Sequence, residues 1–237
     1  MTLTLLILGS LALGLAAPGV IRPFLRRFGL VDVPNHRSSH TKTTLRGGGI
    51  AVMLTVIIGA VLLSVLYSET ALTLSVACGT VVAFGLLGLL EDVKGLPVRV
   101  RLLGQFGLAA VGGVLALHYF DASYWWLLLL VPAGIFLVNA ANFMDGTNGI
   151  SGFHGVLTAV VAVYTGVTVG AISLALFGVG LGGAFAGFLP WNFPRAKMFL
   201  GDVGSYLLGS AMWVTGIWVW FVTGNLILSI SAVAVYS

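Results

Sequence analysis

Two adjacent carboxylates, Glu91 and Asp92, end an apolar run in the stretch LLGLLEDVKGLPVRVRLLGQF, residues 86–106. The chain holds only seven acidic residues, and a carboxylate at mid-bilayer depth costs roughly 2.5 to 3.5 kcal/mol or more. Because adjacent like charges repel, one of the pair would suit a general base, or a bound cation would keep both ionised. The alternative is a solvated interfacial pair that meets Lys94 or Arg99.

A second polar group lies in NAANFMDGTNGISG, residues 139–152, between two apolar runs. Its amides and its carboxylate recur at a spacing of three residues: Asn139, Asn142, Asp145 and Asn148. On a helix terminus this spacing projects the side chains to one side, so we expect them to face a polar cavity. A simple polar turn is the alternative, although packing gives no reason for so many amides at a membrane boundary.

A third stretch, FLPWNFPRAKMFLGDVGSYLLG, residues 188–209, combines an amide, basic groups, aromatic rings and a carboxylate. A helix that begins near Gly201 would present N–H groups and the positive end of its dipole. Asp202 could then act as the helix N-cap or as a metal ligand. The other polar and aromatic members are Trp191, Asn192, Phe193, Arg195, Lys197 and Phe199.

The fourth stretch, DVPNHRSSHTKTTLRGGG, residues 32–49, carries two histidines, basic groups and three consecutive glycines. Glycine lets a backbone approach a ligand closely, and Lys42 and Arg46 beside backbone N–H groups favour phosphate. The alternative is a positive loop that sets membrane orientation and touches lipid headgroups. His36 and His40 have helical spacing, but the polar, Pro-containing sequence indicates a loop and disfavours a metal pair.

The elements that position these groups must be transmembrane helices. Of 237 residues, 59% are hydrophobic and 8% are charged, with a mean hydropathy of +1.09, whereas soluble domains carry roughly 25% charged residues. We predict an all-α polytopic bundle of about nine spans at about 20 residues each. The predicted spans are residues 3–21, 48–67, 71–90, 102–120, 124–141, 150–168, 171–189, 203–222 and 226 onward, with the long run 150–189 divided near 165–170.

The charges predict how this bundle is oriented. If the spans alternate, all eleven Lys and Arg residues fall on one side of the membrane, with five of the seven acidic residues: Asp32, Glu91, Asp92, Asp145 and Asp202. The positive-inside rule makes that side cytoplasmic and the N-terminus periplasmic. The net charge of +4 therefore indicates membrane orientation and not nucleic-acid binding. The first apolar run has no basic residues before it, so we expect a retained span and not a cleaved signal peptide.

Together, the four stretches place carboxylates, amides, basic groups and flexible glycines on one face of the bundle. Carboxylates without a Cys/His cluster favour a hard cation, Mg²⁺ or Mn²⁺, over zinc. Such an ion beside basic groups and helix termini suits a diphosphate, and lipid access suits a membrane-bound substrate. The rival interpretation is a membrane transporter with a polar cytoplasmic vestibule, but no charged residue is centred in a span.

At these four stretches the sequence resembles the polyprenyl-phosphate N-acetylhexosamine-1-phosphate transferases, the glycosyltransferase family 4 group. The matching segments are DVPNHRSSHTKTTLRGGG, GLLEDVKGLPVRVRLLGQ, NFMDGTNGISG and NFPRAKMFLGDVGS, in family order. The group includes phospho-N-acetylmuramoyl-pentapeptide transferase and the WecA- and WbpL-like initiators of O-antigen. The RSSH…RGGG form looks closer to the WbpL-like initiators of lipopolysaccharide O-antigen than to the cell-wall enzyme.

The resemblance implies transfer of a sugar 1-phosphate from a UDP-N-acetylhexosamine to undecaprenyl phosphate, with Mg²⁺ and release of UMP, in the bacterial inner membrane. It implies catalytic roles for Glu91, Asp92 and Asp202, and metal contacts from Asp202 and Asp92. Phe199 would stack on uracil. The implied substrate-binding residues are Asn142, Asp145, Asn148, Asn192, Phe199, Lys42, Arg46 and Lys94.

The sequence departs from the family pattern at three places. The usual Asp–Asp pair reads Glu91–Asp92, which moves the first carboxylate by about one bond length. The usual DGxDG reads DGTNG, with the amide Asn148 in place of a carboxylate. The chain also ends at SISAVAVYS, before the family's later cytoplasmic loop. We therefore expect one integral-membrane domain, residues 1–237, that is truncated, with impaired catalysis as an alternative; a homodimer and the identity of the amino sugar stay open.

Overall fold

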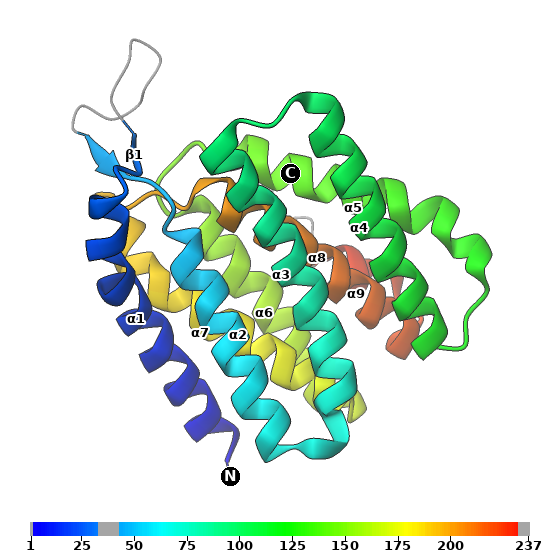
Figure 1. Cartoon of the computed structure of the whole chain (residues 1–237). Helices are drawn as coiled ribbons and strands as arrows, with labels where there is room; N and C mark the ends of the chain where they lie inside the picture. The colour runs from blue at the N-terminus through cyan, green and yellow to red at the C-terminus, as the bar shows by residue number, and fades with distance from the viewer. Residues whose placement is uncertain (1, 33–42, 232–237) are drawn as a thin grey trace.

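Eight long apolar helices make up the bundle in a computed structural model that describes residues 2–32 and 43–231 (Figure 1). Each is long and apolar enough to cross a membrane, which confirms the all-α polytopic prediction: the chain is a multi-pass membrane protein. The helices are α1 (Leu3–Arg27), α2 (Gly49–Leu66), α3 (Ala71–Lys94), α4 (Val98–Tyr119), α5 (Leu127–Met144), α6 (Ile150–Val169), α7 (Ile172–Asn192) and α8 (Gly201–Thr223).

Shorter elements connect these helices. The strands β1 (Val31–Asp32) and β2 (Thr44–Leu45) pair antiparallel, and the 3-10 turns η1 (Ser68–Thr70) and η2 (Tyr124–Trp126) precede α3 and α5. The predicted ninth span begins as α9 (Leu226–Ser231), and residues 232–237 lie outside the described part of the chain. Eight spans are thus confirmed, while the ninth stays a prediction.

Glycines in the left-handed conformation mark two helix ends. Gly170, with φ of 77°, follows α6, so the apolar run 150–189 is divided where the sequence predicted. Gly95, with φ of 62°, follows α3, and its N–H donates to the carbonyl of Glu91. Residues with a side chain rarely adopt this conformation, so glycine ends each helix at a fixed point.

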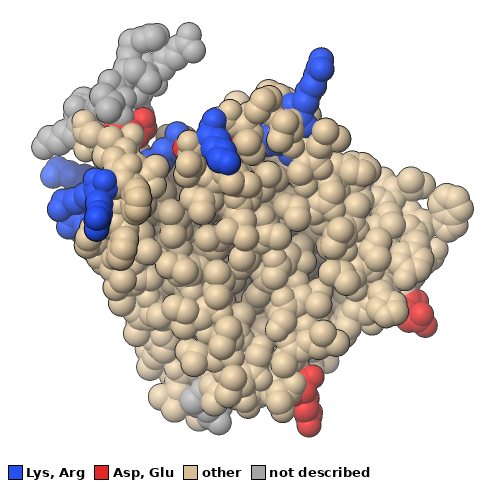
Figure 2. All heavy atoms as spheres, viewed as in Figure 1, with Lys and Arg blue, Asp and Glu red and all other residues tan. Residues whose placement is uncertain are grey.

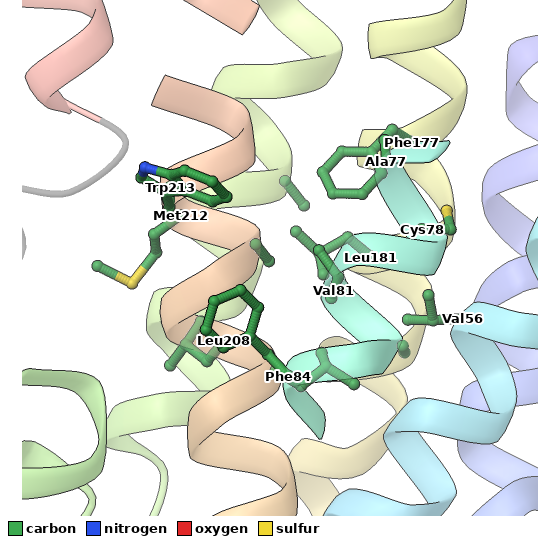
Figure 3. Packing of buried hydrophobic residues seen from close by; sticks show 14 of the residues in the cluster. Val56, Ala77, Cys78, Val81, Phe84, Phe177, Leu181, Leu208, Met212 and Trp213 are labelled. Atoms are coloured by element: carbon green, nitrogen blue, oxygen red, sulfur yellow. The ribbon is translucent and has the colours of Figure 1, made fainter. Parts of the chain in front are cut away.

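The centre of the bundle is formed by α7 and α8. In each of these two helices, 72% of an apolar 18-residue stretch is buried. The buried share of such a stretch is 17% in α1, which lies at the edge of the bundle. Figure 3 shows side chains from α2, α3, α7 and α8 meeting there, with Phe84 near Leu208 and the ring of Phe177 near Ala77. Trp213 packs edge-on against Phe84 and donates its Nε1–H to the Leu130 carbonyl at 2.9 Å, so no polar atom of this ring is left unpaired.

Two glycine contacts bring α2 and α3 against the start of α8. A Cβ on Gly49 would collide with the backbone nitrogen of Gly204, and one on Gly88 would collide with the carbonyl oxygen of Asp202. Small residues allow backbones in a membrane to approach this closely, and dispersion forces then hold the helices together. The three helix ends are therefore fixed relative to one another at the level of the polar segments.

The basic side chains lie at this same end of the bundle. Figure 2 shows the visible Lys and Arg side chains gathered beside β1 and the upper helix ends, and none on the visible face at the opposite end. We call this end, with β1, β2, the α3–α4 turn and residues 193–200, the basic end. The cytoplasmic orientation of the basic end remains a prediction.

Candidate functional site

A cavity of about 260 Å³ opens at the basic end, between the last turn of α5, the loop after it and the first turn of α8. The residues that line it come from segments far apart in the sequence, which the fold brings together. Seven residues singled out from the sequence line it: Arg46, Asn142, Asp145, Asn148, Asn192, Phe199 and Asp202.

One wall of the cavity is made by two loops that bind each other through their backbones. The N–H of Phe199 donates to the Leu45 carbonyl at 2.7 Å, and the N–H of Gly48 donates to the Phe199 carbonyl at 2.8 Å. The N–H of Gly49 donates to the Leu200 carbonyl, also at 2.8 Å. These bonds fix the glycine segment 47–49 beside the start of α8, and they hold Arg46 and Phe199 at the same wall.

Arg46 joins two carboxylates that are distant in sequence. Its Nη2 lies 2.7 Å from Oδ1 of Asp92 and 3.3 Å from Oδ2 of Asp202. The Asp92 side chain is only 4% exposed, whereas that of Arg46 is 42% exposed. A buried carboxylate needs a partner charge, and Arg46 supplies it while remaining reachable from the cavity.

The second oxygen of Asp92 caps α8 from a neighbouring helix. The N–H of Val203 donates to Oδ2 of Asp92 at 3.0 Å. The N-cap position of α8 is Leu200, whose side chain cannot accept a hydrogen bond. The expectation that Asp202 is the N-cap was therefore wrong, because Asp202 lies inside the first turn, and Asp92 satisfies an N–H in its place.

Asp202 is oriented by Asn142 at the end of α5. The Asn142 Nδ2 donates to Oδ1 of Asp202 at 2.8 Å and to Oγ of Ser205 at 3.0 Å. Asp202 keeps partial exposure, 21% of its side chain, toward the cavity. The amide thus fixes the carboxylate without neutralising its charge.

Asp145 is a second carboxylate at the cavity, which Asp32 also lines. Burial raises the pKa of this carboxyl to about 7, a hydrogen bond from Ser151 lowers it, and the negative charges of Asp202 and Asp92 raise it. The Ser151 hydroxyl donates to Oδ1 of Asp145 at 2.6 Å. Asp145 and Asp202 therefore concentrate negative charge at one wall, which a bound cation would stabilise.

Asn192 and Asn148 serve mainly to connect loops. The N–H of Gly149 donates to Oδ1 of Asn192 at 2.6 Å, and Nδ2 of Asn192 donates to the Met198 carbonyl at 3.1 Å. Nδ2 of Asn148 donates to the Pro194 carbonyl at 3.2 Å. Both amides line the cavity while they fasten the loop after α5 to the loop after α7.

Several predicted residues are placed elsewhere. Glu91 does not share the surroundings of Asp92: its Oε1 lies 3.3 Å from Nη1 of Arg101 on α4, because successive helical residues point about 100° apart. Asn139 was expected at the cavity, but it donates to Oε1 of Gln105 at 2.6 Å. Lys94 is exposed and does not line the cavity. The prediction for Lys42, like those for His36 and His40, lies outside the described residues.

Sequence reasoning gave no site role to four residues that the structure brings into play, although it placed Asp32 and Arg101 on the same side of the membrane as the site. Asp32 lines the cavity, Ser151 and Ser205 hold the polar groups there, and Arg101 pairs with Glu91. Ser205 could have been found from its spacing, since it follows Asp202 by three residues on one helix. Nothing in the local pattern would have identified the other three.

The donor set at the cavity fits Mg²⁺ but not a cation held by protein alone. Among residues 2–32 and 43–231, no group of three or more His, Cys, Asp or Glu side chains is arranged to hold a metal. Mg²⁺, however, commonly uses one or two carboxylates together with waters and substrate phosphates. Asp202 and Asp145 present hard oxygen donors to the cavity. Both oxygens of Asp92 are already engaged, so a direct contact from Asp92 would require Arg46 or the α8 N–H to move.

Comparison with known proteins gives one consistent result. Residues 73–220 match the family described as Glycosyl transferase family 4. The chain is 33% identical to a decaprenyl-phosphate N-acetylglucosaminephosphotransferase of Mycolicibacterium smegmatis, over 81% of this chain and 54% of the relative. It is 34% identical to a phospho-N-acetylmuramoyl-pentapeptide-transferase of a Geobacillus species, over 80% of this chain and 67% of the relative.

A third relative shows a similar identity to this chain. It is a Bacillus subtilis protein described as a "Probable undecaprenyl-phosphate N-acetylglucosaminyl 1-phosphate transferase", 33% identical over 80% of this chain and 56% of the relative. The chain thus spans about half the length of the mycobacterial and Bacillus relatives and about two thirds of the Geobacillus one. The matched region contains Asp92, Asn142, Asp145 and Asp202, and Arg46 precedes it.

Proposed function

The chain belongs to glycosyl transferase family 4, and from this premise we propose that it transfers a sugar 1-phosphate from a nucleotide sugar to a polyprenyl phosphate. A lipid phosphate oxygen forms the new bond to the sugar-bound phosphorus. The bond that breaks joins this phosphorus to the bridging oxygen, which leaves with UMP. The product is a lipid-diphosphate-linked sugar for cell-envelope synthesis.

The observation that carries this proposal is the ion-pair and hydrogen-bond chain from Asp92 through Arg46 and Asp202 to Asn142. It connects α3, the β2–α2 segment, α8 and α5 at one cavity. Phosphoryl transfer needs positioning and charge stabilisation more than covalent chemistry, and this arrangement provides both. Polar groups along a transport path would instead lie at mid-span, whereas the residues that line the cavity lie at helix ends and in loops.

The residues of the site have distinct roles in the proposed reaction. Arg46 binds diphosphate oxygens from the cavity wall, since its guanidinium is held by two carboxylates and is still exposed. Asn142 keeps Asp202 in one orientation. Phe199, which lines the same cavity, offers a ring face for a base. Asn148 and Asn192 keep the loops closed around the nucleotide sugar.

Asp202 and Asp145 would hold Mg²⁺, which supplies neutralisation of the diphosphate charge when bound. Asp92 contributes indirectly, by fixing Arg46 and the first turn of α8. Mn²⁺ is the alternative ion, because it accepts the same oxygen donors.

We propose a UDP-N-acetylhexosamine as donor and undecaprenyl phosphate as acceptor, since the relatives are described as acting on undecaprenyl or decaprenyl phosphate. The basic end faces the cytoplasm of a bacterial inner membrane under the positive-inside rule. Initiation of O-antigen is the proposed role within envelope synthesis.

The test is release of UMP from UDP-N-acetylhexosamines by the detergent-solubilised chain with undecaprenyl phosphate. We expect release to require both substrates and Mg²⁺, and to stop on chelation. Folded protein that binds neither substrate would contradict the proposal. A chimera that continues the chain with the C-terminal part of the Bacillus relative then distinguishes a need for further sequence from a wrong assignment.

A further inference from the structure

Four buried polar atoms without hydrogen-bond partners lie on α3, α4 and α8, close to Asp92 and Asp202. They are Glu91 Oε2, Arg101 Nε, Gln105 Nε2 and the Tyr206 hydroxyl, none of which has a hydrogen-bond partner outside this set within the described part of the chain. Gln105 and Tyr206 are both 0% exposed. Buried polar atoms in folded proteins are nearly always paired, so these four indicate a ligand or waters.

The four groups form one cluster. Glu91 and Arg101 are an ion pair, the Arg101 side chain lies within hydrogen-bonding reach of the Tyr206 hydroxyl, and Glu91 acts on that hydroxyl electrostatically. Gln105 follows Arg101 by four residues on α4, so the two side chains lie on the same face of that helix. Because Oε1 of Gln105 accepts from Asn139, its amide nitrogen is turned to the other side.

The cluster has the hydrogen-bonding pattern of a phosphate site. Arg101 Nε, Gln105 Nε2 and the Tyr206 hydroxyl are donors, and only Glu91 Oε2 is solely an acceptor. A phosphate monoester monoanion offers acceptor oxygens and one O–H group, which match three donors and one acceptor. We propose that this cluster, the Glu91–Arg101–Gln105–Tyr206 subsite, binds the phosphate of a lipid monophosphate, the acceptor of the proposed reaction on which this inference rests.

The surroundings favour a lipid-borne phosphate. Arg101 is 25% exposed in its side chain, and on the same helix Leu103 is 72% and Phe106 56% exposed, so the adjacent surface is apolar. In a membrane this surface contacts hydrocarbon. A phosphate that reaches Arg101 along it would carry an apolar tail.

The subsite adjoins the proposed reaction site along two helices. Glu91 adjoins Asp92 and Tyr206 lies one turn beyond Asp202, yet none of the four subsite residues lines the cavity. The attacking and leaving oxygens of a phosphoryl transfer lie roughly in line with phosphorus. With the nucleotide in the cavity, we expect the acceptor phosphate to approach Asp92 and Asp202 from the side of α4.

The test is binding of farnesyl phosphate to the full 237-residue chain in detergent, measured by thermal shift without a second substrate. Farnesol, inorganic phosphate and phosphatidylglycerol serve as comparison ligands. We expect farnesyl phosphate to stabilise the wild type and Tyr206→Phe to weaken its apparent affinity about tenfold, as for loss of one hydrogen bond to a charged group. Tyr67→Phe, the same change at the far end of α2, should leave the affinity unaltered.

Several outcomes would overturn the subsite: equal affinity in Tyr206→Phe and wild type, equal stabilisation by farnesol, or equal stabilisation by inorganic phosphate or phosphatidylglycerol. Arg101→Lys, which keeps the charge but removes Nε, gives a second measurement with the same expected loss. Tyr206-dependent binding without UMP release, in both the chain and the chimera, would instead contradict the proposed reaction and leave the subsite standing. UMP release whose KM for undecaprenyl phosphate is unchanged in both variants would overturn only the subsite.

Discussion

Asp92 on α3 accepts a hydrogen bond at 3.0 Å from the backbone N–H of Val203, in the first turn of α8. A side chain of α3 thereby caps α8, and the other oxygen of the same carboxylate pairs with Arg46. The carboxylate is only 4% exposed, and its two partners offset part of the cost of burying it there. Asp92 therefore has a structural and an electrostatic role, and substitutions can separate them.

Asp92→Asn should abolish transfer while the fold is retained. The amide oxygen can still accept from Val203, but it cannot pair with Arg46, so we expect UMP release to fall at least about a hundredfold. Unfolding should become easier by about 1–2 kcal/mol. Asp92→Ala should cost about 1 kcal/mol more, because the cap is then lost as well. Asp121→Asn, an exposed change at the other end, is the control; equal turnover in Asp92→Asn and this control would disprove the assignment.

Gly88→Ala should destabilise the bundle, whereas Gly79→Ala on the same helix should not. A Cβ at position 88 meets the carbonyl oxygen of Asp202, while nothing lies within 4 Å of one at position 79. We expect a cost of about 1–3 kcal/mol for Gly88→Ala from overpacking. Gly79→Ala should be neutral or stabilising by up to about 1 kcal/mol. Thermal unfolding in detergent compares the two, and similar midpoints would argue against the close α3–α8 approach.

Asn142→Ala should lower turnover without large loss of stability. It removes the hydrogen bonds to Asp202 and Ser205, so the carboxylate loses its fixed orientation. Loss of such an orienting partner typically costs about 10–100-fold in activity or metal affinity. The measurements are UMP release and the Mg²⁺ concentration at half-maximal rate. Asn225→Ala, beyond the far end of α8, is the matched control, and identical Mg²⁺ dependence in both variants would contradict the assigned role.

The pKa of Asp145, raised to about 7, predicts a pH-dependent stability difference. With an ordinary unfolded pKa of about 4, the folded state binds more protons between these values, so the free energy of unfolding falls as pH rises through this window. Asp145→Asn removes that loss. The variant should therefore be stabilised relative to wild type by roughly 1–2 kcal/mol more at pH 8 than at pH 5, because solvent screens the half-buried side chain.

Thermal unfolding of both proteins at the two pH values, without divalent cations, tests this difference. Added Mg²⁺ should narrow it at pH 8, because the proposed cation stabilises the ionised carboxylate of the wild type alone. The same difference in Tm at both pH values would show that Asp145 has an ordinary pKa in the folded chain.

The sequence was sufficient for the architecture because the spans are long apolar runs broken by charges and glycines. It was also sufficient to assign Asn142, Asp145 and Asp202 to one cavity, since all three lie where a span meets a polar loop. It could not show that Glu91 and Asp92 point to different partners, because adjacency along a chain does not fix the direction of a helical side chain. The cap from Asp92 to α8 depends on a tertiary contact that no local pattern encodes.

The neighbours of the polar residues within the spans could not be predicted for a different reason. Gln105 and Tyr206 are single polar residues inside apolar helices, where a sequence pattern gives no sign of what faces them. Only the packing of α3, α4, α5 and α8 reveals that their neighbours are Glu91, Arg101 and Asn139.

The partial exposure of Arg101 beside an apolar helix surface has a kinetic consequence. A lipid acceptor that arrives there diffuses in two dimensions within one leaflet, so its encounter rate follows its mole fraction in the bilayer and not its bulk concentration. Dilution of the membrane with inert phospholipid, at constant total acceptor and enzyme, should then slow the reaction. The soluble nucleotide sugar enters from water and should show no such surface dilution.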